Sequence, residues 1–200
     1  AMFQSYNAAA AGATKLYVPR VVKDYWGYQG GLKIQNVGTA PTDVTITYRF
    51  GANSYTQTIE NLGPNQAKGL YMGTPSQVPA LAGVVGSGSA VIESSGQPII
   101  ATANEDNRTE GFGVTYNAIP DGGQTNAVLF PQITAKYYGF CGGVQVQNVG
   151  GSDATVTAVF SMQGRTDVTV SASVPSMGSV SWFAPSVVGA DFNGSVVVSA

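Results

Sequence analysis

The stretch YWGYQGGLKIQNVG at residues 25–38 returns as YYGFCGGVQVQNVG at residues 137–150. The offset is 112 residues, and it also separates the flanking prolines Pro19 and Pro131. Self-similarity at a fixed period is the signature of tandem structural units. Because a β-sandwich domain needs about 100 residues, the chain is expected to contain two such units.

The two ends of the chain are out of phase with this repeat. Residues 6–8 match residues 116–118, and residues 194–199 match residues 88–93. When the start of the chain is placed after its end, the second repeat lacks only the counterpart of residues 95–110. Those residues hold one strand-like run and a polar loop. A sandwich without one of its strands exposes a sheet edge at which another chain can pair.

Hydrophobic and polar residues alternate with a period of two, as Leu32 and Ile34 do with their neighbours, and this pattern is typical of half-buried strands. With 26 Gly and 10 Pro, the sequence holds no capped amphipathic helix of ten or more residues. We therefore expect an all-β fold of two tandem antiparallel β-sandwich units, the second lacking a strand within the chain. Strands of the first unit are expected at 15–22, 32–35, 44–49, 54–62, 67–72, 87–94, 99–104 and 113–117.

The boundary between the units is expected in the Gly-rich segment 119–125. Residues 1–8 are interpreted as a strand that completes a neighbouring or preceding unit, residues 9–122 as the first sandwich, and residues 123–200 as the second, incomplete one. Two explanations of this phase stay open at this point. The chain is either a whole subunit or a section of a longer tandem protein.

The composition argues against several classes of partner. Charged residues make up 10% of the chain, against a usual value of about 25%, and the net charge is −2. Nucleic acids and anionic membranes both require a basic surface, so neither is expected as a partner. No apolar run approaches the roughly 18 residues of a membrane-spanning helix. A weakly charged surface instead favours dense self-association.

The sequence offers no catalytic group of a familiar kind. It contains no histidine, which excludes Ser-His-Asp and Cys-His nucleophiles and histidine-ligated zinc. The single cysteine, Cys141, can form no disulfide within the chain, and it is expected to lie covered beneath the aromatic segment. The acidic segment 104–110 lacks the spacing of a calcium loop and is interpreted as a solvated hairpin loop. We therefore expect no enzyme activity, no catalytic residue, no metal site and no cofactor.

An aromatic cluster stands out in each repeat. It is either a platform on which a sugar ring stacks, or a structural loop that covers the end of a sandwich or contacts another subunit. Its members are Tyr25, Trp26, Tyr28, Tyr137, Tyr138 and Phe140.

The motif QNVG at residues 35–38, followed by DVTI at 43–46, recurs at 147–150 with ATVT at 154–157. Together with GSAVIESSGQPIIATAN at 88–104, it resembles the tandem immunoglobulin-like repeats of secreted bacterial surface and filament proteins. The resemblance implies an extracellular or cell-surface location and brings no catalytic residue with it.

Two classes of function follow as expectations. The first is a structural subunit of an extracellular filament, sheath or cell-surface array, in which copies of the chain assemble head-to-tail by β-strand complementation. The second is an adhesin or carbohydrate-binding module that contacts surface glycans through the aromatic cluster. In the first, residues 3–8 of one subunit pair with the second unit of its neighbour, and the expected interface residues are Phe3, Gln4, Ser5, Tyr6, Asn7, Trp182, Phe183, Val196 and Val198.

Overall fold

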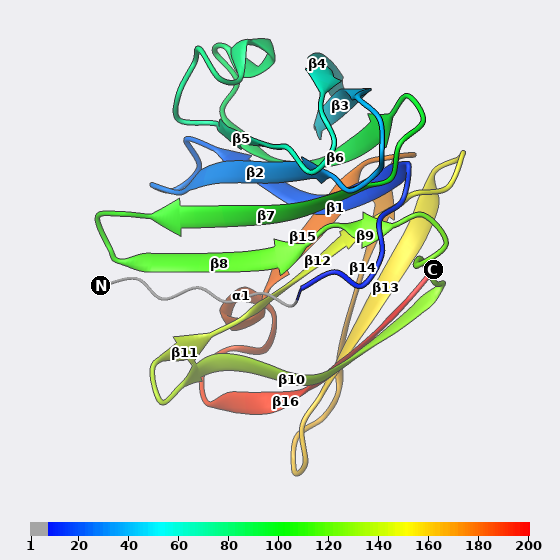
Figure 1. Ribbon diagram of the computed structural model, residues 1–200. Helices are drawn as coiled ribbons and strands as arrows, with labels where there is room; N and C mark the ends of the chain where they lie inside the picture. Colours follow the sequence, from blue (N-terminus) through cyan, green and yellow to red (C-terminus); the bar gives the residue numbers. More distant parts are fainter. Residues whose placement is uncertain (1–7) are drawn as a thin grey trace. The chain divides into compact units, whose positions relative to one another are not determined.

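A computed structural model describes residues 8–200 of the chain, and residues 1–7 lie outside the described part. The chain divides into two compact units, Ala1–Gln124 (unit 1) and Thr125–Ala200 (unit 2). Each unit has its own hydrophobic core. Figure 1 shows the strands that build them.

Unit 1 is a sandwich of two antiparallel sheets. The first sheet has the order β4-β3-β6-β1-β9 and contains β1 (Lys15–Lys23), β3 (Thr42–Phe50), β4 (Asn53–Leu62), β6 (Gly86–Ser94) and β9 (Ile119–Pro120). The second has the order β5-β2-β7-β8 and contains β2 (Gln29–Asn36), β5 (Ala67–Tyr71), β7 (Ile99–Asn107) and β8 (Phe112–Asn117). A single turn of 3-10 helix, η1 (Pro79–Leu81), precedes β6.

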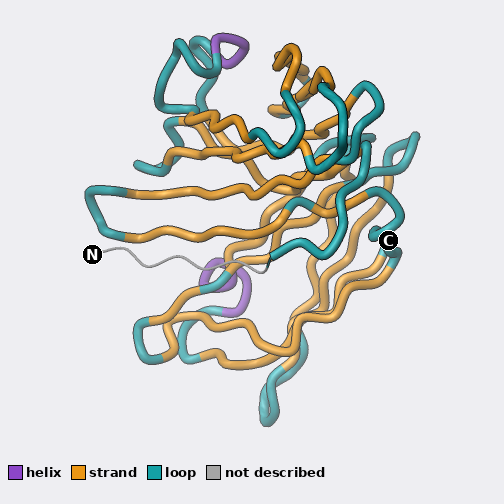
Figure 2. The backbone as a smooth tube through the Cα atoms, viewed as in Figure 1, coloured by secondary structure: helices purple, strands orange, loops and turns teal. Residues whose placement is uncertain are grey.

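Unit 2 also has two antiparallel sheets. The larger has the order β11-β10-β16-β13-β14 and contains β10 (Ala127–Tyr137), β11 (Phe140–Cys141), β13 (Ala154–Ser161), β14 (Val168–Val174) and β16 (Phe192–Ser199). The smaller pairs β12 (Gly143–Gln147) with β15 (Ser179–Phe183), and a short helix, α1 (Ala184–Val188), follows β15. The all-β sandwich fold expected from the sequence is thus confirmed, and Figure 2 shows how little helix the chain contains. Within residues 8–200, no helix has the length and apolar character needed to cross a bilayer.

The 112-residue repeat is visible strand by strand. The strands β10, β12, β13, β14, β15 and β16 stand where unit 1 has β1 to β6, and they pair in the same order. The difference lies after β16, because residues 125–200 contain no counterpart of β7 or β8. In the sequence, the relative of β8 is the segment 3–8 at the start of the chain, of which residues 3–7 lie outside the described part.

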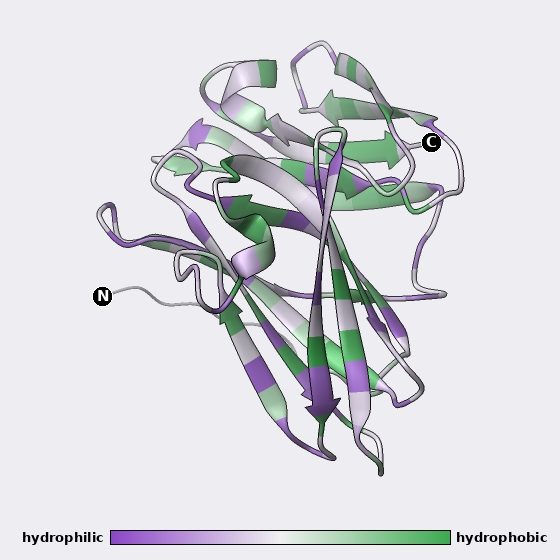
Figure 3. Ribbon diagram, turned by 90° about the horizontal axis from the view of Figure 1, so that it is seen from above, coloured by the Kyte–Doolittle hydropathy of each residue, from purple (hydrophilic) through white to green (hydrophobic). Residues whose placement is uncertain are grey.

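The period-two pattern of the sequence explains how each core forms. Along β3, the residues Val44, Ile46 and Tyr48 are buried, and the residues between them are half-buried. Successive side chains of a strand point to opposite faces, so one face of each sheet is apolar and packs against its partner sheet. Figure 3 shows this alternation as green and paler or purple bands along the strands.

The QNVG motif has the same structural task in both units. The side-chain amide of Asn36 donates hydrogen bonds to the carbonyls of Ala40 and Leu62, both at 2.8 Å, and its oxygen accepts one from the backbone N–H of Gly38. Asn148 makes the same three bonds, to Ser152, Val174 and Gly150. Because β2 and β4 belong to different sheets, Asn36 ties the two layers of unit 1 together.

The repeated proline lies in a β-bulge. The register between β1 and β6 shifts between Val18 and Val21, and the register between β10 and β16 shifts between Phe130 and Ile133. Pro19 and Pro131 occupy these bulges, where a residue without an N–H group leaves no ladder bond unmade. A bulge is therefore a place where a strand with neighbours on both sides tolerates proline.

One buried hydroxyl distinguishes the two cores. Tyr48 is fully buried, its hydroxyl has no hydrogen-bond partner among the described residues, and burial raises its pKa well above the usual value. The counterpart in unit 2 is Phe160, which is also fully buried.

Replacing Tyr48 with phenylalanine is therefore expected to leave the free energy of unfolding unchanged or to raise it by up to about 1 kcal/mol, because an unpaired buried hydroxyl stabilises nothing. The reverse change, Phe160→Tyr, should lower it by about 1–3 kcal/mol. Thermal and urea denaturation of the full chain measure both. A marked loss of stability in Tyr48→Phe would show that the hydroxyl does have a partner.

Candidate functional site

The smaller sheet of unit 2 ends at β12. In unit 1 the corresponding strand, β2, pairs with β5 on one edge and with β7 on the other. In unit 2, β12 pairs with β15, the counterpart of β5, and no other strand of the described chain pairs with it. We call the side of residues 143–146 that faces away from β15 the open edge of unit 2.

The hydrogen-bond pattern shows which backbone groups face the open edge. Adjacent residues of a strand direct their N–H and C=O groups to opposite sides. Towards β15, the carbonyl of Gly142 accepts a bond from Ala184 at 3.0 Å, and the N–H of Asn148 donates to Gly178 at 2.9 Å. The even-numbered residues of β12 therefore bond to β15, and the odd-numbered ones, such as Gly143 and Gln145, face the open edge.

Apolar residues that are covered in unit 1 are uncovered in unit 2. Leu129 is 73% exposed, whereas its counterpart Tyr17 is 5% exposed, and Val128 is 38% exposed against 2% for Leu16. In unit 1, β9 pairs with β1 at Leu16 and Tyr17. The segment that follows β6 in unit 1 thus covers this part of the sandwich, and residues 125–200 provide no such cover for unit 2.

The expected interface residues of unit 2 fall into two groups. Trp182 and Phe183 lie on β15, opposite Val144 and Gly143; Trp182 packs partly against the core, and Phe183 is exposed. Val196 and Val198 lie on β16, which is paired on both edges, and they are buried in the core of unit 2. The remaining expected interface residues, Phe3, Gln4, Ser5, Tyr6 and Asn7, lie outside the described residues.

The aromatic cluster forms a tight hairpin turn in each unit. Tyr25 and Tyr28 exchange backbone hydrogen bonds of 3.1 and 2.9 Å across a two-residue turn. Both central residues have positive φ, 53° at Trp26 and 79° at Gly27, as in a type I′ turn. Lys136, Tyr138 and Gly139 repeat the positive φ angles of Asp24, Trp26 and Gly27 in unit 2.

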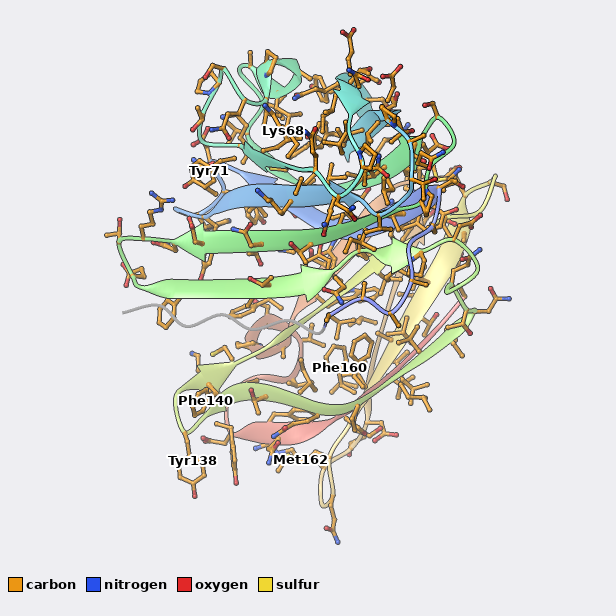
Figure 4. All side chains as sticks on the ribbon, viewed as in Figure 1. Lys68, Tyr71, Tyr138, Phe140, Phe160 and Met162 are labelled. Carbon is orange, nitrogen blue, oxygen red and sulfur yellow. The ribbon has the colours of Figure 1, made fainter. Side chains whose placement is uncertain are left out.

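The aromatic residue at each turn tip projects into solvent. Trp26 is 82% exposed and Tyr138 is 86% exposed, and each ring meets the preceding tyrosine edge to face. Figure 4 shows Tyr138 and Phe140 at the turn between β10 and β11, with the Tyr138 ring directed away from the ribbon. A positive φ is unfavourable for a large side chain, and type I′ turns favour Asn or Gly there. The local fold therefore gives no reason for an aromatic residue at either tip.

Cys141 is exposed, so the expectation that it lies covered beneath the aromatic segment is wrong. It belongs to β11, a two-residue strand at the edge of its sheet. In the described part of the chain, no strand lies beyond β11 to cover the side chain.

The acidic segment 104–110 forms the β7–β8 hairpin, as expected, but it is only partly solvated. Asp106 and Asn107 are buried. Asp106 accepts a hydrogen bond from the Tyr71 hydroxyl at 3.3 Å and lies 3.5 Å from the Arg108 guanidinium. Among the described residues, no cluster of acidic or cysteine side chains is arranged to hold a metal ion.

Sequence reasoning missed a polar network in unit 1. The Arg20 side chain donates from Nε to both carboxylate oxygens of Glu105, at 3.0 and 2.9 Å, and from Nη1 to Ser87. The Tyr116 hydroxyl accepts a hydrogen bond from the backbone N–H of Arg20 and donates one to the carbonyl of the same residue, and burial raises the pKa of that hydroxyl. The network fastens β1 to β7 and β8; unit 2 has Gln132 in place of Arg20. The arginine lies 85 residues from Glu105 and 96 from Tyr116, so no local pattern reveals the network.

No family model matches the chain, and no curated protein does. Among solved structures, the chain is similar to the crystal structure of Thermotoga maritima 1070, with a TM-score of 0.45 and 18% identity over 56% of this chain and 98% of that one. It is also similar to the Anabaena sensory rhodopsin transducer, with a TM-score of 0.33 and 19% identity over 47% of this chain and 97% of that one. Likenesses this distant assign neither family nor function.

Proposed function

We propose that the chain is a non-enzymatic structural subunit of an extracellular filament, sheath or cell-surface array, and that unit 2 of one copy is completed by a β-strand of its neighbour. The observation that carries this proposal is the open edge of unit 2. An unpaired row of backbone donors and acceptors beside an apolar surface is a template for another strand. Edges of this kind are usually blocked by charges or proline, and β12 has neither.

The composition supports self-association as the outcome. With charged residues at 10% and a net charge of −2, copies of the chain meet little electrostatic repulsion when packed. The resemblance of the QNVG repeats to immunoglobulin-like repeats of secreted bacterial surface proteins favours a place outside the cell. The absence of histidine and the scattered carboxylates favour a protein without catalysis.

The proposed donor is the segment 3–8. Its sequence relative in unit 1 is β8, which lies one strand further from β2 than β7 does. Because no described strand takes the place of β7 in unit 2, the first backbone available to an incoming strand is β12 itself. A donor at one end of the chain and an acceptor in unit 2 make a head-to-tail contact, which grows a fibre when it does not close into a ring.

Electron microscopy of the purified chain at neutral pH tests this proposal. Regular fibres are expected, and a variant without residues 1–8 is expected to give dispersed particles under the same conditions. Dispersed particles from the full chain would contradict the proposal. Fibres that form equally well without residues 1–8 would remove that segment as the donor.

The aromatic turns support a second function, the binding of surface glycans. Two turns at equivalent positions carry exposed aromatic rings in spite of an unfavourable backbone conformation. Strain that persists without a local reason points to a functional constraint. An exposed ring on a neutral, polar surface suits the apolar face of a sugar, and Tyr25 and Tyr28 supply further hydroxyls nearby.

Replacing Trp26 with asparagine distinguishes the stability of the turn from glycan binding by its ring. The change places an Asn-Gly pair in a type I′ turn, so the free energy of unfolding should rise by about 1 kcal/mol. If the ring binds sugars, retention of the chain on a printed glycan array should fall about fivefold or more. Tyr138→Asn is the matched change in unit 2. A more stable variant with unchanged retention on every glycan would contradict the binding function of the turn.

A further inference from the structure

We infer that the open edge of unit 2 is a docking site for a partner strand of one particular pattern: Gln followed by Pro, inward apolar residues two, four and six positions after the Gln, and Asn seven positions after it. The inference rests on the proposed completion of unit 2 and names the chemistry of the strand that fits best. In unit 1 this pattern is Gln97-Pro98-Ile99-Ile100-Ala101-Thr102-Ala103-Asn104, which enters and forms β7.

The glutamine of this pattern binds a loop backbone in unit 1. The side-chain oxygen of Gln97 accepts hydrogen bonds from the N–H groups of Thr39 at 3.0 Å and Ala40 at 3.3 Å. The Gln97 side chain lies directly on Gly38, so closely that no Cβ would fit there. Gly38 and the N–H groups of Thr39 and Ala40 therefore form a binding site for a glutamine side chain, which we call the glutamine socket.

Unit 2 keeps this socket, and no side chain of residues 8–200 occupies it as Gln97 does in unit 1. Gly150 is the counterpart of Gly38, and Gly151 and Ser152 are the counterparts of the two donors. All three are exposed, and no described acceptor bonds to the N–H groups of Gly151 and Ser152. Among residues 8–200, only Asn148 and Ser152 of the same loop come within 4 Å of a Cβ placed on Gly150, in the space that Gln97 fills in unit 1.

The asparagine of the pattern also lies against a glycine, and we call this second contact the asparagine socket. In β2, Gly31 stands opposite Asn104, and a Cβ on Gly31 would lie 2.6 Å from the asparagine Oδ1. In β12 the counterpart is Gly143, which is exposed and faces the open edge. Of the described atoms, only the β15 backbone at Trp182 and Phe183 comes within 4 Å of a Cβ placed on Gly143.

The residues between the two sockets complete the match. In unit 1, Ile99, Ala101 and Ala103 are buried opposite Asn36, Ile34 and Leu32. Unit 2 has Asn148, Val146 and Val144 at these positions, and Val146 is half-buried where Ile34 is fully buried. A strand with small apolar residues at the three inward positions would restore this burial.

The donor proposed for self-assembly lacks the pattern. In the segment 3–8, Gln4 and Asn7 are three positions apart, so one strand cannot place them in both sockets. A partner polypeptide with the full pattern therefore binds the open edge more tightly than the segment 3–8. It also blocks the growth of a polymer, because both strands pair with β12.

A labelled peptide with the sequence of residues 95–107 tests the inference by fluorescence anisotropy against the full chain at a concentration where it stays dispersed. Saturable binding is expected, and alanine at the Gln97 or Asn104 position of the peptide should weaken it about fivefold to tenfold. In the protein, Gly150→Ala fills the glutamine socket and should weaken binding similarly. The matched control is Gly96→Ala in unit 1, because a Cβ there meets nothing within 4 Å and Gly96 lies outside the open edge.

Absence of binding, equal binding of a scrambled peptide, or preferential binding of a peptide of residues 1–8 would each overturn the inference. Electron microscopy of the same samples distinguishes a failure of this inference from a failure of the proposed function. Peptide binding by a chain that never forms fibres keeps the docking site and removes self-assembly. Fibres that form while the peptide fails to bind keep self-assembly and remove the docking site.

Discussion

Replacing Gln145 with proline should abolish polymerisation while unit 2 stays folded. Gln145 is an odd-numbered residue of β12, so its N–H group faces the open edge and not β15. Proline removes that donor and puts its ring in the path of an incoming strand, and strands tolerate proline where the N–H would face outward. Electron microscopy should show dispersed particles, with a far-UV circular dichroism spectrum like that of the unchanged chain.

Ser181→Pro is the matched control for this change. Ser181 stands opposite Gln145 in the same sheet and donates a side-chain hydrogen bond to it, so either proline removes this pair. The backbone of Ser181 faces the other edge of the sheet, whose counterpart β5 is an edge strand in unit 1 as well. Fibres are expected from Ser181→Pro and not from Gln145→Pro. Fibres from both variants would show that the open edge is not the assembly site.

Replacing Gly194 with alanine should lower the free energy of unfolding by about 2–3 kcal/mol. Gly194 lies opposite the proline bulge of β10, and a Cβ there would press into the backbone carbonyl of Ser161, far inside van der Waals contact. Gly88 has the same relation to the carbonyl of Arg49 in unit 1. Backbone atoms at a strand pair cannot move aside as a flexible side chain can, so both alanine variants should lose stability.

Gly96→Ala and Gly151→Ala are the controls for the two units, because a Cβ at either position meets nothing within 4 Å. In urea denaturation, the free energy of unfolding of Gly88→Ala and of Gly194→Ala should be well below that of these controls. Equal stability of all four variants would mean that the close approach of backbone and glycine is not a requirement of the bulge.

The sequence was sufficient to predict the two-unit organisation and most strands. Alternation such as that of Val44, Ile46 and Tyr48 reports directly which face of a strand is buried, and a 112-residue repeat of such strands implies a repeated sandwich. The phase of the repeat also indicated which strand unit 2 would lack. These features are local or periodic, so a linear sequence displays them.

Features that depend on distant partners escaped prediction. The Arg20–Glu105 ion pair joins strands 85 residues apart, and the exposure of Cys141 depends on what lies beyond β11. The direction in which each amide of β12 points follows from its register with β15, which alternation alone does not fix. The backbone strain at Trp26 was likewise hidden, because an aromatic residue is not the usual mark of a type I′ turn.

Residue-resolved hydrogen exchange of β12 in the dispersed and the assembled chain tests the completion of unit 2 most directly. In the dispersed chain, the amides of Gly143 and Gln145 should exchange rapidly, whereas those of Val144 and Val146 are protected by β15. Assembly should slow exchange at Gly143 and Gln145 by about a hundredfold or more, because a donated strand then accepts their hydrogen bonds. Rapid exchange at these two amides in fully assembled fibres would contradict the completion of unit 2 by a donated strand.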